Sequence, residues 1–311
     1  MGRYLIRRLL LLIPVTIGVV TVAFLLMHIS PGDPALAYLG NRATPKAVAA
    51  LHHKWGLDTP LWQQYCSFIA GLATGHLGDS LYFKTPITTL LATRIPLTLL
   101  LMFMSAIIAL VISVPLAVLA SLHEDGIADL IVRFLNALAQ GMPQFWVGTM
   151  LIVYLSVDAG LFPVGGYGDT IGQHFWSLVL PSITVAIGIT PILVKSLRSS
   201  MLDALSSQYV EYARTKGVDN HSILFKYVLR NACISGVSVF GISVGSLAGG
   251  SLIVENIFAL PGMGATMMKA ILTRDYPVVQ VCTVIFAVIV VIVYLLTDIA
   301  YSIIDPRVRL Q

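Results

Sequence analysis

The chain has 311 residues, of which 57% are hydrophobic and only 11% are charged, and its mean hydropathy is +0.87. These values exclude an ordinary soluble protein and indicate an integral membrane protein. The net charge of +4 is explained by a positively charged cytoplasmic face, so we expect membrane lipid and no nucleic acid as a partner.

Six stretches are long enough to cross a bilayer and contain no Lys, Arg, Asp or Glu. They predict an all-α integral membrane protein with six transmembrane helices at 9–29, 95–122, 134–157, 170–194, 231–254 and 276–297. The first stretch is not interpreted as a signal peptide, because its apolar run is too long and because turn-forming residues follow it in place of a small-residue cleavage site.

Counting Lys and Arg predicts the orientation. With the N-terminus inside, the short cytoplasmic segments hold twelve of these residues and the opposite side holds seven, five of them in the long segment 30–94. A segment of that length can cross regardless of its charge. We therefore expect both termini and the loop 197–230 to face the cytoplasm.

The segment 30–94 is predicted to be extracytoplasmic and helical. Thr44-Pro45 and Thr59-Pro60 each offer a capping residue followed by proline at the first helical position. Gly56 can end the first of these helices. Three further glycines interrupt the end of the second: Gly71, Gly75 and Gly78.

Histidines and cysteines do not predict a metal site or a disulfide. Neighbouring residues on a helix point apart, so the histidines of the segment are interpreted as surface residues: His52, His53 and His76. The three cysteines lie far apart in the sequence and are interpreted as small packing residues: Cys66, Cys233 and Cys282.

The longest charged run, QYVEYARTKGVDNHSILFKYVLR, occupies 208–230. Its first part predicts a short helix that ends at Gly217, a residue suited to the left-handed conformation. Asp219 or Asn220 can cap a second short helix that runs to Arg230. An apolar span lies close on each side, so the unit must lie at the membrane face, which argues against a DNA-binding helix-turn-helix.

This run resembles the EAA loop in the membrane subunits of ABC importers, which reads Glu-Ala-Ala, three residues, Gly, and then an apolar-Leu-Pro ending. Glu211, Ala213 and Gly217 match, whereas Tyr212 replaces the middle Ala and Leu229-Arg230 replaces Leu-Pro. The sequence pattern Tyr-Val-x-x-Ala-Arg-x-Lys-Gly is similar to that of the peptide and nickel branch of these permeases. In that family the loop docks into a groove on a cytoplasmic ATPase, which implies these coupling residues: Tyr209, Glu211, Ala213, Arg214, Lys216, Gly217, Leu229 and Arg230.

The fifth span carries Gly241, Gly245 and Gly249 at four-residue spacing, which leaves one helix face without side chains. This face is predicted to be a packing seam, against another helix of this chain or against a second permease subunit. Prolines are expected to kink or break the other spans: Pro115, Pro143, Pro181 and Pro191.

A turn-rich stretch follows the fifth span and is predicted to lie at the outer face. Its sequence is very similar to the corresponding stretch in the same peptide and nickel permease branch. The residues of this outer-face motif are Glu255, Pro261, Gly262, Gly264, Arg274, Asp275 and Pro277. With Gly32-Asp33-Pro34 and Asp305-Pro306-Arg307, the resemblance covers nearly the whole chain.

The resemblance implies a type I ABC importer permease in a bacterial cytoplasmic membrane. Its implied partners are a homologous second permease subunit, two ATPase subunits and an extracytoplasmic binding protein. No ATP-binding glycine loop is present, so ATP and Mg are expected on the ATPases, with no cofactor or metal in this chain. Four segments are expected. Residues 1–29 form the N-terminus and first transmembrane helix, and residues 30–94 form the extracytoplasmic helical segment. Residues 95–301 form a five-helix permease core that includes the cytoplasmic loop 197–230, and residues 302–311 form a cytoplasmic tail.

Two other classes of protein compete with a permease. An intramembrane enzyme has no motif to support it. A secondary transporter or channel usually needs ionisable groups in the membrane, and only Glu255 and Asp298 lie beside the spans. The substrates that the branch implies are dipeptides, oligopeptides, glutathione-like peptides or nickel chelates, and the sequence leaves the choice among them open.

Overall fold

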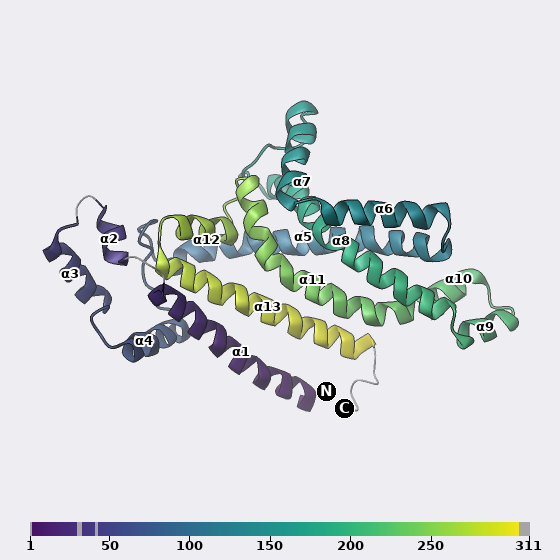
Figure 1. Ribbon diagram of the computed structural model, residues 1–311, viewed down its shortest axis with the longest axis horizontal. Coiled ribbons are helices and arrows are strands. Elements are labelled where there is room, and N and C mark those ends of the chain that lie inside the picture. Colours follow the sequence, from purple (N-terminus) through teal and green to yellow (C-terminus); the bar gives the residue numbers. More distant parts are fainter. Residues whose placement is uncertain (1, 30–32, 41–42, 305–311) are drawn as a thin grey trace. The chain divides into compact units, whose positions relative to one another are not determined.

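The computed structural model describes residues 2–29, 33–40 and 43–304, and within these ranges the chain is helical (Figure 1). One isolated bridge, between Asp79 and Pro86, is the only extended pairing among the described residues. The predicted all-α class is confirmed. Most of the predicted tail 302–311, with Arg307 and Arg309, lies outside the described residues, as does Gly32.

Contacts divide the chain into two compact units. Unit 1 comprises Met1–Thr98 with Pro261–Val291, and unit 2 comprises Leu99–Leu260 with Ile292–Gln311. Two long helices, α5 (Ile87–Leu122) and α13 (Tyr276–Ile304), each contribute to both units. The units therefore do not coincide with the segments expected from the sequence.

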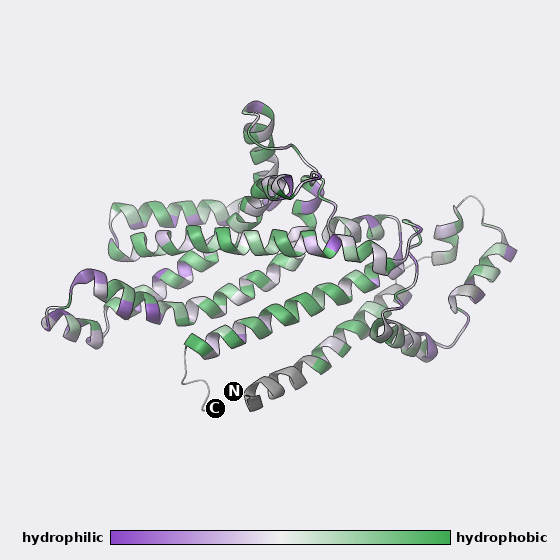
Figure 2. Ribbon diagram, turned by 180° about the vertical axis from the view of Figure 1, so that it is seen from behind, coloured by the Kyte–Doolittle hydropathy of each residue, from purple (hydrophilic) through white to green (hydrophobic). Residues whose placement is uncertain are grey.

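Among the described residues, four helices are long and apolar enough to cross a membrane: α5, α8 (Ile171–Leu205), the continuous helix Asn220–Ile257, and α13. They contain the second, fourth, fifth and sixth predicted spans. The first predicted span lies in α1 (Gly2–Ile29), which contains the shorter apolar stretch Ile13–Leu25. Figure 2 shows that these long helices are predominantly apolar.

The third predicted span, 134–157, is not a single helix. In its place α6 (Ile127–Gly141) ends before Pro143, and α7 (Gln144–Leu151) continues into the π-helix η2 (Ile152–Asp158). Proline disfavours helical geometry at the residue before it, and Met142 is extended, with φ −86° and ψ 125°. The apolar helix Gln144–Asp158 is therefore shorter than the span expected from hydropathy.

The other prolines do not end their helices. Pro181 and Pro191 lie inside α8, and Pro115 lies inside α5. Within α8, Thr184 and Thr190 hydroxyls donate to the carbonyls of Leu180 and Ala186, each at 2.8 Å. These two threonine side chains thus satisfy their hydrogen bonds locally, as an apolar environment favours.

In unit 1 the segment after α1 forms three short helices: α2 (Pro34–Leu39), α3 (Pro45–Trp55) and α4 (Leu61–Thr74). Thr44 caps α3 by accepting from Ala47 N–H at 3.2 Å, and Gly56 ends it with φ 69°, both as predicted. The helix α2 begins in the same way, with Asp33 as the capping residue and Pro34 at the first helical position. The sequence analysis does not predict this helix.

The start of α4 differs from the prediction by one residue. Pro60, rather than Thr59, is the residue before the helix, and no side chain caps it. The Thr59 hydroxyl instead donates to the carbonyl of Gly56 at 2.6 Å. Gly75 follows α4 with φ 77°. Tyr65, Phe68 and Leu72 of this helix pack against Val20 and Ala23 of α1 and Val284 of α13.

In unit 2, α11 (Arg230–Ile257) meets α13 through glycines. A Cβ at Gly241 would overlap the side chain of Thr297, and one at Gly245 would stand 2.9 Å from Cε1 of Tyr294. Gly249 is exposed, and nothing lies within 4 Å of its Cβ position. Two of the three predicted seam glycines therefore face a helix of the same chain, whereas Gly249 faces none of the described residues of this chain.

We predict that Gly241→Ala destabilises the folded chain by about 1–3 kcal/mol, because the added methyl group overpacks the contact with Thr297. Gly249→Ala is the matched control, since it adds the same methyl group to the same helix where nothing is in contact. It should be neutral or slightly stabilising because alanine favours helix. Thermal unfolding in detergent measures both, and equal losses would refute the packing argument.

Candidate functional site

The helix α9 (Gln208–Thr215), which carries half of the predicted coupling residues, is amphipathic. Val210 and Ala213 are buried, with exposed fractions of 0% and 5%, and their three-residue spacing puts them on one face. The residues on its other faces are exposed: Tyr209, Glu211, Tyr212, Arg214 and Lys216. Figure 2 shows the hydrophilic character of this loop.

The buried face of α9 belongs to an apolar cluster, here called the loop-anchoring cluster, that joins α5, α6, α8 and α11 to the loop. Its buried members are Ala117, Ala120, Val132, Val194, Leu197, Met201, Ala204, Val210, Ala213, Ile223, Val228 and Ala232. Fully burying a side chain the size of valine stabilises by roughly 1.5–3 kcal/mol. The loop is therefore held on unit 2, with its polar face outward.

Gly217 has the geometry that the sequence predicts. Its φ is 76°, its N–H donates to the Arg214 carbonyl at 3.0 Å, and the N–H of Val218 donates to the Ala213 carbonyl at 3.1 Å. These bonds complete the carbonyl end of α9. Nothing lies within 4 Å of a Cβ at Gly217, so a substitution there would meet backbone strain alone.

The second predicted helix of the loop is not a separate unit. Asp219 caps it as expected, accepting from Ser222 N–H at 2.8 Å, but α10 (Asn220–Ser222), the π-helix η3 (Ile223–Leu229) and α11 form one continuous helix of 38 residues. The expected end at Arg230 is therefore wrong. Arg230 stands where the general EAA pattern has proline, so nothing breaks the helix.

A side-chain bridge joins α9 to the base of α11. Asn231 Nδ2 donates to the Tyr209 hydroxyl at 2.8 Å and to the Tyr227 carbonyl at 3.0 Å. At the tip of the loop, Lys216 Nζ stands 4.6 Å from the centroid of the Tyr212 ring, whose residue is 61% exposed. Of the last two predicted coupling residues, Leu229 is half-buried and Arg230 is exposed.

A buried ion pair that the sequence reading missed connects α6 to α8 beside the same cluster. Arg198 donates Nε to Asp129 Oδ1 and Nη2 to Asp129 Oδ2, both at 2.6 Å. Asp129 is fully buried, and Arg198 is 20% exposed. Arg133 Nη2 lies 3.4 Å from Asp129 Oδ2. The signal was present in the sequence, because Asp129 and Arg198 are among the few charged residues of two mainly apolar helices.

The ion pair sets the ionisation of Asp129. The two hydrogen bonds from Arg198 hold the pKa of this carboxyl below its ordinary value; burial opposes them, and the Asp125 N–H adds to the effect. A carboxyl with a depressed folded-state pKa stabilises the fold above its unfolded pKa. That contribution is lost as pH falls through the folded value.

The outer-face motif does not form one site. Glu255, in unit 2, is fully buried near the end of α11, and its carbonyl accepts from Leu260 N–H at 2.8 Å. Gly262, in unit 1, is the residue before α12 (Met263–Leu272), and Gly264 is buried inside that helix. The Pro261 carbonyl accepts from Arg94 Nη1 at 3.0 Å.

Asp275 is the most connected residue of this motif. It is fully buried, and its Oδ2 accepts from the Ser80 hydroxyl at 2.5 Å and from Tyr82 N–H at 3.0 Å. Arg274 before it has φ 57°, and Pro277 lies in the first turn of α13. The motif therefore ties the segment 30–94 to the start of α13, which is a structural role.

Sequence comparison matches nearly the whole chain to one family. The profile described as "binding-protein-dependent transport system inner membrane component" matches residues 113–310, and the profile of the N-terminal region of such components matches residues 1–102. Oligopeptide transport system permease protein AppB of Bacillus subtilis is 38% identical, over 99% of this chain and 100% of that protein.

Further relatives match this chain over nearly their whole length. Dipeptide transport system permease protein DppB of Lactococcus lactis is 34% identical over all of both chains, and DppB of Escherichia coli K12 is 34% identical over 99% of both. Among solved structures, inward-facing MetNI methionine ABC transporter matches with a TM-score of 0.60 and 19% identity. That match covers 71% of this chain and 98% of the other chain, and it shows the fold.

The fold and the anchored loop thus define a multi-pass membrane transport subunit of the type I ABC importer permease class, which is not itself an enzyme. The chain belongs to the family of binding-protein-dependent transport system inner membrane components. It is a permease subunit of an ATP-driven importer. Membership of this family implies ATPase and substrate-binding partners in general and sets aside an uncoupled transporter or channel.

We predict that Asp129→Asn destabilises the chain by on the order of 3 kcal/mol, because it leaves the guanidinium of Arg198 without its charged partner in a largely buried site. Asp125→Asn is the matched control, since the Asp125 side chain is 80% exposed and lies 3.5 Å from Arg133. An exposed pair of this kind is worth about 0–1 kcal/mol.

The same pair predicts a pH dependence. Thermal unfolding of the parent chain should lose the Asp129 contribution only below the ordinary carboxyl pKa of about 4. The stability difference between parent and Asp129→Asn should therefore shrink in acid and be constant near neutrality. A difference that grows as the pH falls would contradict the assigned ion pair.

Proposed function

We propose that this chain is one of two homologous permease subunits of a bacterial importer that carries short peptides across the cytoplasmic membrane. Two cytoplasmic ATPase subunits, which bind ATP and Mg, drive the import, and an extracytoplasmic binding protein delivers the peptide. The observation that carries the coupling role is α9, a helix fixed by one face and polar and exposed on the other.

The anchoring of α9 suggests how an ATPase moves the permease. Val210 and Ala213 lie in the loop-anchoring cluster together with residues of α5, α6 and α8, and Asn231 links Tyr209 to α11. A protein that binds the exposed Glu211, Tyr212 and Lys216 face therefore pushes on helices that run through unit 2. Packed interfaces of this kind transmit small displacements, because they repack rather than deform continuously.

The peptide substrate is proposed from the relatives, whose names describe dipeptide and oligopeptide transport. They are similar to this chain over its full length. A nickel chelate, the other substrate class suggested by the sequence, is named for none of these relatives. Uptake assays with dipeptides, longer peptides and nickel complexes separate these substrates, and uptake of a nickel complex alone would overturn the peptide proposal.

We predict that Gly217→Val uncouples the importer without unfolding it. Valine at φ 76° carries strain of about 1–2 kcal/mol, too little to unfold the chain but enough to redirect the tip of α9. The variant should insert at the parent level, bind the ATPases more weakly, and lose the ATP hydrolysis that peptide-loaded binding protein stimulates in proteoliposomes.

Gly75→Val is the matched control, because Gly75 has φ 77° and also has nothing within 4 Å of its Cβ position. It carries the same strain outside the loop and should retain coupling. Parent-level transport by Gly217→Val with the ATPases still bound would contradict the coupling role. Absence of Gly217→Val protein from the membrane would show instead that the loop is needed for folding.

The proposed orientation predicts a labelling pattern in intact spheroplasts. An impermeant maleimide should label Cys66, which is exposed on α4, and spare half-buried Cys233 and buried Cys282. A cysteine introduced by His221→Cys, at an exposed position beside the loop tip, should react only after permeabilisation. Labelling of the loop cysteine before permeabilisation, with Cys66 protected, would invert the topology.

A further inference from the structure

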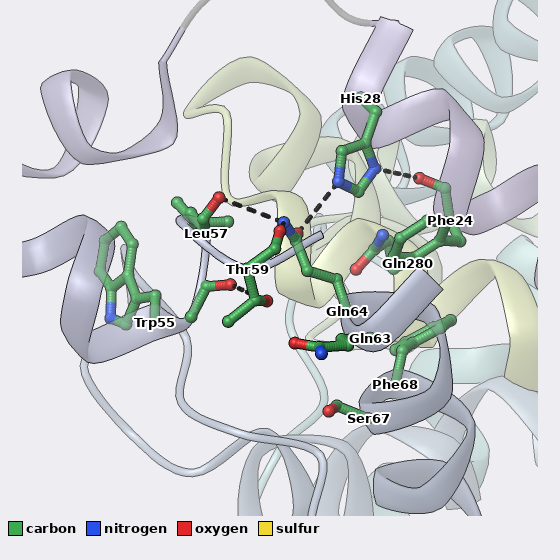
Figure 3. Close-up of a pocket in the computed structure, with 11 residues that line it drawn as sticks. Phe24, His28, Trp55, Leu57, Thr59, Gln63, Gln64, Ser67, Phe68 and Gln280 are labelled. Atoms are coloured by element: carbon green, nitrogen blue, oxygen red, sulfur yellow. Dashed lines mark hydrogen bonds between the residues drawn. The ribbon is translucent and has the colours of Figure 1, made fainter. Parts of the chain in front are cut away.

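Unit 1 contains a cavity of about 330 Å³ between α1, α3, α4 and α13 (Figure 3). Aromatic rings and amide side chains line it together: Phe24, Trp55, Gln63, Gln64, Phe68 and Gln280. Trp55 and Gln280 border it from opposite sides in Figure 3. A combination of apolar surface with a few polar groups is characteristic of small-molecule sites.

A second cavity, of about 630 Å³, adjoins the first. The two share Trp55, Leu57 and Gln280 in their walls. The second cavity is also lined by Asp79 and Lys84, which bring a negative and a positive charge to its exposed side. Together the cavities offer a space of ligand size that is neutral at one end and carries both charges at the other.

Gln280 is a buried polar residue whose amide donor the fold leaves unused. It lies in the second turn of apolar α13, is only 8% exposed, and its Nε2 has no hydrogen-bond partner among the described residues. A buried amide donor without a partner is costly, and most such groups in folded proteins are paired. Gln280 lies in the walls of both cavities, and because its Nε2 is enclosed, the side chain must rotate for this donor to reach a bound molecule.

The neighbouring polar side chains are already fixed by hydrogen bonds. Gln64 Nε2 donates to the carbonyls of Leu57 at 3.1 Å and Thr59 at 2.8 Å, and its Oε1 lies 3.2 Å from His28 Nε2. His28 Nδ1 lies 3.0 Å from the Phe24 carbonyl. The wall is therefore pre-organised, which lowers the entropic cost of binding.

We propose that these joined cavities bind a short zwitterionic peptide, with Gln280 donating to a peptide carbonyl and the aromatic rings covering apolar side chains. A glutamine side chain carries a primary amide, whose N–H can donate to a peptide carbonyl. At the charged end of the joined cavities, Asp79 or Lys84 can pair with one charged terminus of the peptide, which a neutral sugar lacks. This inference rests on the proposed function, and it gives the permease a peptide site of its own.

The test is thiol protection on the full-length chain in nanodiscs, where both faces are accessible. Ser67 lines the first cavity, so Ser67→Cys in a Cys66→Ser background reports occupancy through its rate of maleimide labelling. Saturating tri-alanine should slow this labelling at least fivefold. Unchanged Cys66 is the matched control, because it is the adjacent exposed residue and lies outside the cavity lining; tri-alanine should leave its rate unaltered.

Gln280→Leu, added to the Ser67→Cys reporter, tests the role of the unpaired Nε2 donor of Gln280. We expect it to abolish protection by tri-alanine while the melting temperature of the chain stays the same or rises, since an unpaired buried amide is removed. Protection that persists, or a melting temperature that falls sharply, would show that Gln280 serves packing and would overturn its assignment. Protection by maltotriose in place of tri-alanine would overturn the peptide class.

The proposed function has a separate measurement, peptide-stimulated ATP hydrolysis by the reconstituted importer. If the importer hydrolyses ATP in response to peptide-loaded binding protein but Ser67→Cys is never protected, the cavity proposal fails and the transport function stands. If Ser67→Cys is protected but no peptide stimulates hydrolysis, the cavity binds peptide and the peptide importer assignment fails.

Discussion

The burial of Val210 and Ala213 in the loop-anchoring cluster, which also contains residues of α5, α6 and α8, is the interaction on which the functional account depends. It gives a short helix with a polar outer face a fixed position beside the membrane helices, which an eight-residue helix does not have in isolation. The ion pair of Asp129 with Arg198 supports the same region, because it fixes α6 to α8 where both contribute to the loop-anchoring cluster. Apolar packing and the ion pair thus stabilise the same region, the loop-anchoring cluster.

The sequence predicted features that arise from local chemistry. Thr44-Pro45 marked the start of α3, Gly56 and Gly217 marked left-handed helix ends, and Pro143 marked a break. The pattern around Glu211 and Gly217 identified the loop and its family. Each of these signals depends on one or two neighbouring residues, whose backbone preferences hold in any tertiary context.

The features that it missed depend on contacts between distant residues. The partner of Asp129 is 69 positions away, and that of Asp275 is 195 positions away. Four-residue spacing identified Gly241 and Gly245, but it could not show that α13 passes them and leaves Gly249 exposed. The sequence predicts a helix end at Arg230, where the charged run meets the apolar span. A charged residue on a helix surface does not interrupt the helix, so the structure continues through Arg230.

The central claim is that the polar face of α9 contacts an ATPase, and site-specific photo-crosslinking tests it most directly. A benzoylphenylalanine placed at Tyr212, which is 61% exposed, should give an ATPase adduct in the assembled importer. The same probe at Tyr82, which is 47% exposed and belongs to unit 1, should give none. Adducts from Tyr82 and not from Tyr212 would contradict the account.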